Sequence, residues 1–235
     1  MLRQFPDWHR SPLSPHRRMF ATLLVLGLAA CTPPARPVVV YPPLRTAADS
    51  TLLTIYGKGQ TFADFVAQAT QRREGWLRLQ RDAVVRPELL ARARAVGGTW
   101  QVLVVARDGC GDSMNSVPYA ARLVDSVPGM SLRIVSPSDG QAAANTHRTD
   151  DGRMATPTFI LLDASGNDAG CLVELPAPLR QWTNKARGKV SDDSLHAYRT
   201  TFYTKDAGVS VSTELVELLE AAHAGSPQCD RQHAR

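Results

Sequence analysis

The 235-residue sequence has four cysteines but no C-x-x-C pair. A dithiol redox enzyme carries two cysteines at that spacing, and a structural zinc site needs two pairs of ligands. Both classes of site therefore lack their usual signature here. The sequence also lacks an apolar run of about twenty residues, which a helix needs to cross a bilayer. The apolar run at 19–28 is about half that length.

An excess of one charge sign is missing as well, once the first 30 residues are set aside. Those residues hold four arginines and one aspartate, so the remaining chain has 23 basic and 21 acidic residues and a net charge of +2. No basic stripe is present, and the high isoelectric point of the whole chain is no evidence for nucleic acid as a partner.

The N-terminus is typical of export. Arg17 and Arg18 precede the apolar run, and Leu28-Ala29-Ala30-Cys31 resembles the bacterial lipoprotein box. We expect a signal peptide over 1–30, a lipidated Cys31, and a location on a membrane, facing the periplasm or the cell exterior. The alternatives are an ordinary signal peptide with a chance cysteine, or a start at Met19.

The rest of the chain divides by composition. Five prolines among residues 32–43 favour an extended spacer, so 31–47 is predicted to be a tether. Residues 48–225 have the length of one α/β domain with helices at its N-terminus, and 226–235 are predicted to be a flexible tail.

Cys110 is the most informative residue. The apolar strand predicted at 100–106 ends just before it, and a predicted helix starts just after it. At such a turn, unpaired N–H groups and the helix dipole can lower a thiol pKa from about 8.5 into a range of about 3.5–7.5. Cys110 is therefore a candidate nucleophile, with Ser113 at the position of a resolving cysteine.

The remaining pattern predicts alternating helices and strands. Helical spacing begins at the capping box Thr61–Asp64 and continues to Leu77, and further helices are expected at 87–96, 111–127, 142–147, 176–186 and 212–222. Strands are expected at 132–135, after Pro157, and at 169–174, the last two as a hairpin. The strands at 100–106 and 132–135 should be parallel, since a helix joins them. Residues 188–211 fit no clear pattern.

These residues resemble the thioredoxin-like family, in the branch with a W-C-G-D-C or W-C-G-D-S signature followed by V-P. Cys110-Gly111-Asp112-Ser113, Val117-Pro118 and Thr156-Pro157-Thr158 carry the resemblance. It implies a central mixed sheet flanked by helices. It also implies that Cys110 attacks and that Pro157 is a cis proline facing the thiol, with Thr156, Gly109 and Gly111 beside a bound substrate.

The departures from that family limit the predicted chemistry. Gly109 stands where the family usually has Trp, and Ser113 removes the second thiol. Exchange, isomerisation, deglutathionylation or retention of a partner as a mixed disulfide all remain open, with protein or small-molecule thiols as partners. A noncatalytic binding module is the competing class. Asp108 and Asp112 flank the thiol and would oppose its ionisation if close, and Arg107 would offset them.

Two further cysteines and a histidine have weaker interpretations. Cys171 lies in an apolar strand and is expected to be buried as a small hydrophobic residue. Cys229 lies in the predicted flexible tail and could pair with Cys171 or with Cys110, which sequence cannot decide. His147 is expected to be exposed to solvent. No metal or cofactor is predicted.

Overall fold

The computed structural model describes residues 47–229, so the predicted signal peptide, Cys31 and most of the tether lie outside the described residues. The helices are α1 (Ala47–Lys58), α2 (Phe62–Gln68), α3 (Arg73–Asp82), α4 (Pro87–Val96), α5 (Gly111–Asp125), α6 (Gln141–Thr146), α7 (Ala177–Ala186), α8 (Asp192–Asp206) and α9 (Val209–His223). The strands are β1 (Trp100–Val105), β2 (Met130–Val135), β3 (Thr158–Leu162), β4 (Asp168–Val173) and β5 (Gln228–Cys229).

A five-stranded mixed sheet organises the domain, in the order β2-β1-β3-β4-β5. β1 and β2 are parallel, as the helical connection between them predicts. β3 runs antiparallel to both β1 and β4, and β5 is parallel to β4. The predicted hairpin is thus the pair β3–β4. The expected mixed α/β architecture, with helices before the core, is confirmed.

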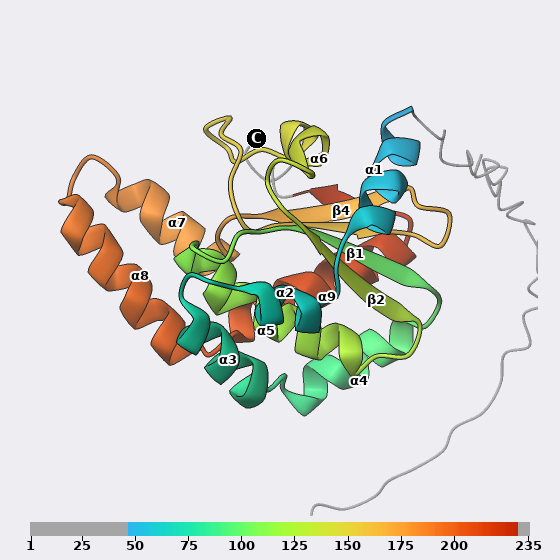
Figure 1. The fold of residues 1–235 in the computed structure, drawn as a ribbon, viewed down its shortest axis with the longest axis horizontal. Helices are drawn as coiled ribbons and strands as arrows, with labels where there is room; N and C mark the ends of the chain where they lie inside the picture. Colours follow the sequence, from blue (N-terminus) through green and yellow to red (C-terminus); the bar gives the residue numbers. More distant parts are fainter. Residues whose placement is uncertain (1–46, 230–235) are drawn as a thin grey trace, which may run out of the picture. The chain divides into compact units, whose positions relative to one another are not determined.

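Helices cover both faces of the sheet. Apolar residues of β1 alternate between the two faces, so each face has its own core. Val102 and Val104 belong to a large core that packs against helices of one face, including α3, α5 and α9. Leu103 and Val105 belong to a smaller core with residues of α1 and α6. Figure 1 shows α1 and α6 on one side of the sheet and α4, α5 and α9 on the other.

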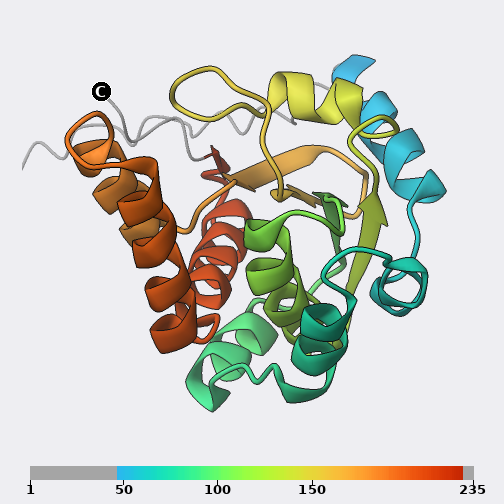
Figure 2. The same ribbon diagram turned by 60° about the vertical axis from the view of Figure 1, so that its left-hand side comes forward.

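The segment left unassigned from sequence, residues 188–211, contains the whole of α8 and the first residues of α9. α8 has no buried residue, and its ring contact with α7 is the stack of Tyr198 on Trp182, with ring centroids 3.5 Å apart. Figure 2 shows α7 and α8 as an antiparallel pair, with α8 beside α9. Tyr203 and Arg199 of α8 contact Asp112, so α8 also reaches the end of α5 that carries Cys110.

The predicted tail is attached to the sheet over its described part. β5 pairs with β4, and Cys229 forms a disulfide with Cys171, 58 residues earlier. The expectation of a flexible Cys229 is therefore wrong. Of the two partners that the sequence left open, Cys171 and Cys110, the structure shows Cys171. Residues 230–235 lie outside the described residues. Across residues 47–229, no helix is both long and apolar enough to cross a membrane.

Candidate functional site

Cys110 is the N-cap of α5, at the turn that follows β1. Its backbone is extended, with φ −83° and ψ 122°, and its Sγ accepts the backbone N–H of Ser113 at 3.5 Å. The side chain is partly buried, and Cys110 is the free cysteine among the residues that the structure describes. The predicted strand–turn–helix setting of this thiol is therefore present.

The loop before β3 faces this thiol. The Thr156–Pro157 peptide bond is cis, as the resemblance predicts. The Cys110 thiol donates to the carbonyl oxygen of Thr156 at 3.1 Å. The strand that follows starts at Thr158, so Pro157 lies at a strand end, where its missing N–H costs no ladder bond.

Within residues 47–229, no second free thiol lies beside Cys110. Ser113 is fully buried, and its Oγ has no hydrogen-bond partner among the described residues. Cys171 is buried, as expected, but its sulfur is bonded to Cys229. Cys171 therefore does not serve as a distant resolving thiol while that disulfide is intact.

The space beside Gly109 is filled from a distant part of the chain. A Cβ at Gly109 would lie 2.3 Å from Oε1 of Gln71, so only glycine fits under the Gln71 side chain as it is placed. Nε of Arg72 donates to the carbonyl oxygen of Gly109 at 2.9 Å. Gln71 and Arg72 therefore form a wall over Gly109, the position where the resemblance would place a Trp.

Asp108 holds that wall in place. Its Oδ2 accepts the backbone N–H groups of Thr70 at 2.8 Å and Gln71 at 2.9 Å, and the Thr70 hydroxyl at 3.2 Å. These bonds hold the pKa of the Asp108 carboxyl below its usual range, and the bond from the Gln71 N–H contributes most to this effect. Arg72 follows with a left-handed backbone, φ 51°. The Asp108 carboxylate is thus engaged by the 70–71 backbone.

Trp76 joins the same contact from α3. It is fully buried, and its indole Nε1 donates to the carbonyl oxygen of Asp108 at 2.9 Å. The Trp76 ring also packs against the rings of Phe62 and Phe65, with ring centroids 6.4 Å and 5.1 Å apart. Trp76 therefore links the leading helices both to the core and to the turn of Cys110.

Asp112 is bound from α8. The hydroxyl of Tyr203 donates to its Oδ1 at 2.9 Å, and Nη1 of Arg199 lies 3.4 Å from its Oδ2. Burial raises the pKa of Asp112, and Arg199 and Tyr203 partly offset this effect. Burial likewise raises the pKa of Tyr203 well above its usual range.

A cleft of about 620 Å³ opens at Cys110. Its lining residues are Val105, Arg107, Cys110, Asp112, Pro137, Ser138, Gln141, Ala144, Arg153, Met154, Ala155, Thr156 and Glu174. Arg107 and Met154 are exposed there. The cleft therefore gives a substrate access to the thiol, to Thr156 and to side chains of both charge signs.

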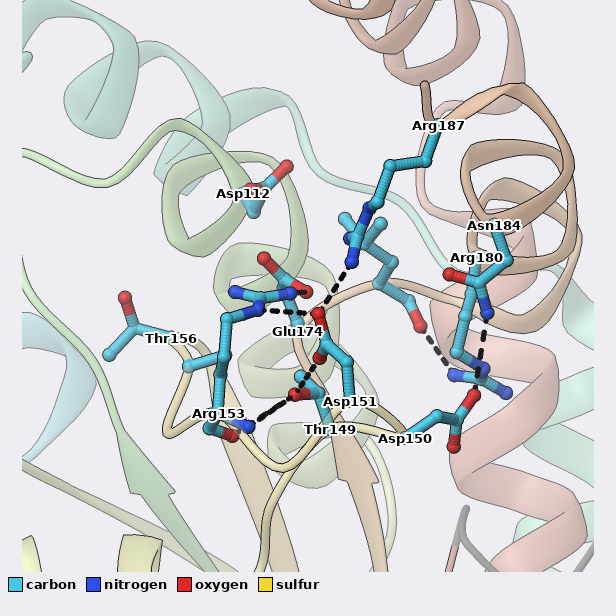
Figure 3. Close-up of polar contacts among 12 residues, drawn as sticks. Asp112, Thr149, Asp150, Asp151, Arg153, Thr156, Glu174, Arg180, Asn184 and Arg187 are labelled. Atoms are coloured by element: carbon cyan, nitrogen blue, oxygen red, sulfur yellow. Dashed lines mark hydrogen bonds and ion pairs between the residues drawn. The ribbon is translucent and has the colours of Figure 1, made fainter. Parts of the chain in front are cut away.

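An ion-pair network fixes the loop that borders this cleft (Figure 3). Nη2 of Arg153 donates to Oε2 of Glu174 at 3.1 Å, and its Nε donates to Oδ2 of Asp151 at 2.8 Å. Arg187, just after α7, also binds Asp151. The bond from Arg153 contributes most to holding the pKa of Asp151 well below its usual range. Glu174 itself has a left-handed backbone, φ 64°.

His147 is buried, with 3% of its surface exposed, so the expectation of an exposed side chain is wrong. Its Nδ1 lies 2.8 Å from the carbonyl oxygen of Ala143, and its Nε2 lies 2.8 Å from Oδ2 of Asp168. Within residues 51–229, its ring and the sulfurs of Cys171 and Cys229 lie within 4.8 Å of one another. Those sulfurs are joined as a disulfide, so they are not free to ligate a metal in this state.

The residues that surround the thiol from other elements are not predicted by the sequence pattern. For Gln71 and Arg72 the sequence contains one indirect signal. Gly109 stands where the family usually has Trp, so some other residue must cover that position. Arg199 and Tyr203 leave no such signal, since they lie in the segment without an apolar pattern. All four reach the site through contacts between residues at least 37 positions apart in the sequence.

Comparisons with known proteins agree with this fold. A family model described as thioredoxin matches residues 59–187, more than half of the chain. A crystal structure of a protein of unknown function from Pseudomonas aeruginosa is 19% identical, with a TM-score of 0.56, and the match covers 72% of this chain and 96% of that one. A crystal structure of an HIV epitope-scaffold is 18% identical, with a TM-score of 0.56, and the match covers 72% and 97%. These two likenesses concern the fold alone. No match was found among curated proteins.

Proposed function

The chain belongs to the thioredoxin family, and we propose that it performs monothiol thiol–disulfide exchange through Cys110 while anchored to a membrane. One observation carries the proposal. The Cys110 sulfur stands at the start of the 15-residue helix α5, accepts the N–H of Ser113, and opens into a cleft beside the cis Thr156–Pro157 bond. An anion at this position benefits from the helix dipole and from the N–H donor.

The reaction follows from these contacts. Loss of the thiol proton breaks the bond to the Thr156 carbonyl and leaves the Ser113 N–H as donor to the sulfur. The Cys110 thiolate then attacks one sulfur of a disulfide in the cleft. A mixed disulfide forms, and the other sulfur leaves as a thiolate. Because Ser113 has no thiol, an external thiol must release the product.

The test compares the full-length protein with Cys110→Ala and Ser113→Cys. After reaction with hydroxyethyl disulfide, we expect the wild type to retain one mercaptoethanol adduct, detected by mass spectrometry. Cys110→Ala should retain none. Ser113→Cys should lose the adduct without added thiol, because residue 113 is at the resolving position and its backbone N lies 3.5 Å from the Cys110 sulfur. An adduct equally abundant in the wild type and in Cys110→Ala would refute the proposal.

A noncatalytic binding module is the second candidate, and one contact favours it. The bond from the Cys110 thiol to the Thr156 carbonyl exists only while the thiol is protonated. In that role the surface around Cys110 and Pro157 would hold an extended peptide of a partner. Wild type and Cys110→Ala would then capture the same partners from cells under non-reducing conditions, whereas thiol exchange predicts partners that only the wild type captures.

The proposed location has its own test. The basic pair Arg17–Arg18, the apolar run and Cys31 support export and lipidation, with the domain facing the periplasm or the cell exterior. Cys31→Ser should move the protein from the membrane fraction to the soluble fraction after osmotic lysis. Unchanged fractionation would argue against a lipid anchor.

A further inference from the structure

A second hollow, of about 490 Å³, lies between α3, α5 and α8. The basic residues of its lining are Arg72, Arg78, His196 and Arg199, and a single carboxyl group, that of Asp112, accompanies them. Asp112 also lines the cleft of Cys110, so the two openings share one wall. The hollow therefore adjoins the thiol site and carries an excess of basic groups.

These basic groups are largely unpaired. Asp112 is already bound by Arg199 and Tyr203. Within the described part of the chain, the guanidinium of Arg78 and the ring of His196 make no hydrogen bond or ion pair, and Arg72 uses only its Nε. The Nε of Arg199 is buried without a partner. Four basic side chains, those of Arg72 at the N-cap of α3, Arg78, His196 and Arg199, thus line a common space. Within the described residues, each of the three arginines has an N–H group without a partner.

Two of the arginines are held in fixed positions. Nε of Arg72 is bound to the carbonyl of Gly109, and its guanidinium lies 3.6–3.7 Å from where a Cβ of Gly111 would stand. Its backbone follows the segment that Asp108 clamps. Arg199 is held by Asp112. Positively charged groups fixed before binding lose little side-chain freedom when an anion arrives, which favours affinity.

We propose that this hollow binds the carboxylate of an acidic low-molecular-weight thiol, which is the co-substrate that releases Cys110 from its mixed disulfide. The inference rests on the proposed function, because Ser113 and the Cys171–Cys229 disulfide leave no second thiol within residues 47–229 for that step. The thiolate sulfur of the co-substrate bonds to the sulfur of the bound substrate, and the bond to Cys110 breaks. Cys110 leaves with the electron pair and is reduced, while the co-substrate is oxidised to a disulfide with the substrate.

The experiment measures how the charge of the releasing thiol affects its rate. Full-length protein carrying the neutral mercaptoethanol adduct on Cys110 is treated with mercaptosuccinate, 2-mercaptoethanol or cysteamine, and loss of the adduct is followed by mass spectrometry. Each rate is divided by the rate of the same thiol on a short cysteine peptide carrying that adduct. We expect the corrected rate to be about tenfold higher for mercaptosuccinate than for cysteamine, as electrostatic attraction permits, and to fall toward equality in high salt.

Variants locate the effect. Arg78→Gln should reduce the preference for mercaptosuccinate about fivefold, the effect of one lost ion contact near the surface, and adding His196→Gln should reduce it further. Arg81→Gln, an exposed arginine of α3 outside the hollow, should not change it. Equal corrected rates, or a preference lost in Arg107→Gln but kept in Arg78→Gln, would overturn the inference and leave the proposed function standing. Failure of Cys110 to form the adduct would instead remove the proposed function.

Discussion

The disulfide between Cys171 and Cys229 allows a quantitative prediction of stability. It closes a loop between residues 58 positions apart. Constraining the unfolded chain over a loop of that length stabilises the native state by about 4 kcal/mol on the chain-entropy account. We therefore expect Cys229→Ser to lower the free energy of unfolding by up to about 4 kcal/mol, which corresponds to about 8–16 °C in melting temperature for a domain of this size.

The assay is urea unfolding of the full-length protein under non-oxidising, thiol-free conditions, monitored by tryptophan fluorescence. Cys110→Ser is the matched control, because it removes a thiol that forms no internal disulfide, and its midpoint should stay close to that of the wild type. Wild type reduced with a phosphine should unfold like Cys229→Ser. A loss below about 1 kcal/mol in both the variant and the reduced protein would refute the entropy argument, since a closed loop of this length must cost more to break.

Three other perturbations test the turn around Cys110. Asp108→Ala should cost about 2 kcal/mol at neutral pH, because it removes charge-assisted bonds to the 70–71 backbone. Because the pKa of Asp108 is lowered in the folded state, this contribution disappears as pH falls below the usual aspartate range. The urea midpoints of the wild type and Asp108→Ala should therefore converge in acid, and parallel pH curves of the two proteins would contradict the assignment. Asp112→Asn should show the opposite trend: the raised pKa of Asp112 means that the wild type loses stability as pH rises from about 4, and the variant should lack this loss in the same titration. Trp76→Phe should cost about 2 kcal/mol in urea unfolding, because it leaves the Asp108 carbonyl without its donor, and a cost near zero would mean that water replaces the indole.

The sequence was sufficient for the features that depend on local pattern. The parallel pair β1–β2, the hairpin β3–β4 and the N-cap position of Cys110 all follow from apolar periodicity and turn residues. Thr61 caps α2 as its capping box predicts. The cis bond before Pro157 could not come from pattern, since cis prolines are a minority of about 5%, and it rested on the family resemblance.

The missed features depend on contacts between distant residues. The helical spacing after Thr61 predicted continuous helix, but the chain leaves the helix at residues 69–72, where Asp108 binds the exposed N–H groups. α8 has no buried residue and hence no apolar stripe to detect. β5 has two residues and depends on its pairing with β4 and on the Cys229 disulfide. No local signal records such contacts.

The wall formed by Gln71 and Arg72 has a consequence for engineering. Transfer of the four residues 110–113 into another member of the family would move the thiol without its surroundings, because the covering side chains come from a segment 37 positions earlier. A transplant would need residues 70–76 as well, with Asp108 to anchor them. The surroundings of Cys110 thus come from two separate pieces of chain, and neither piece is a portable motif.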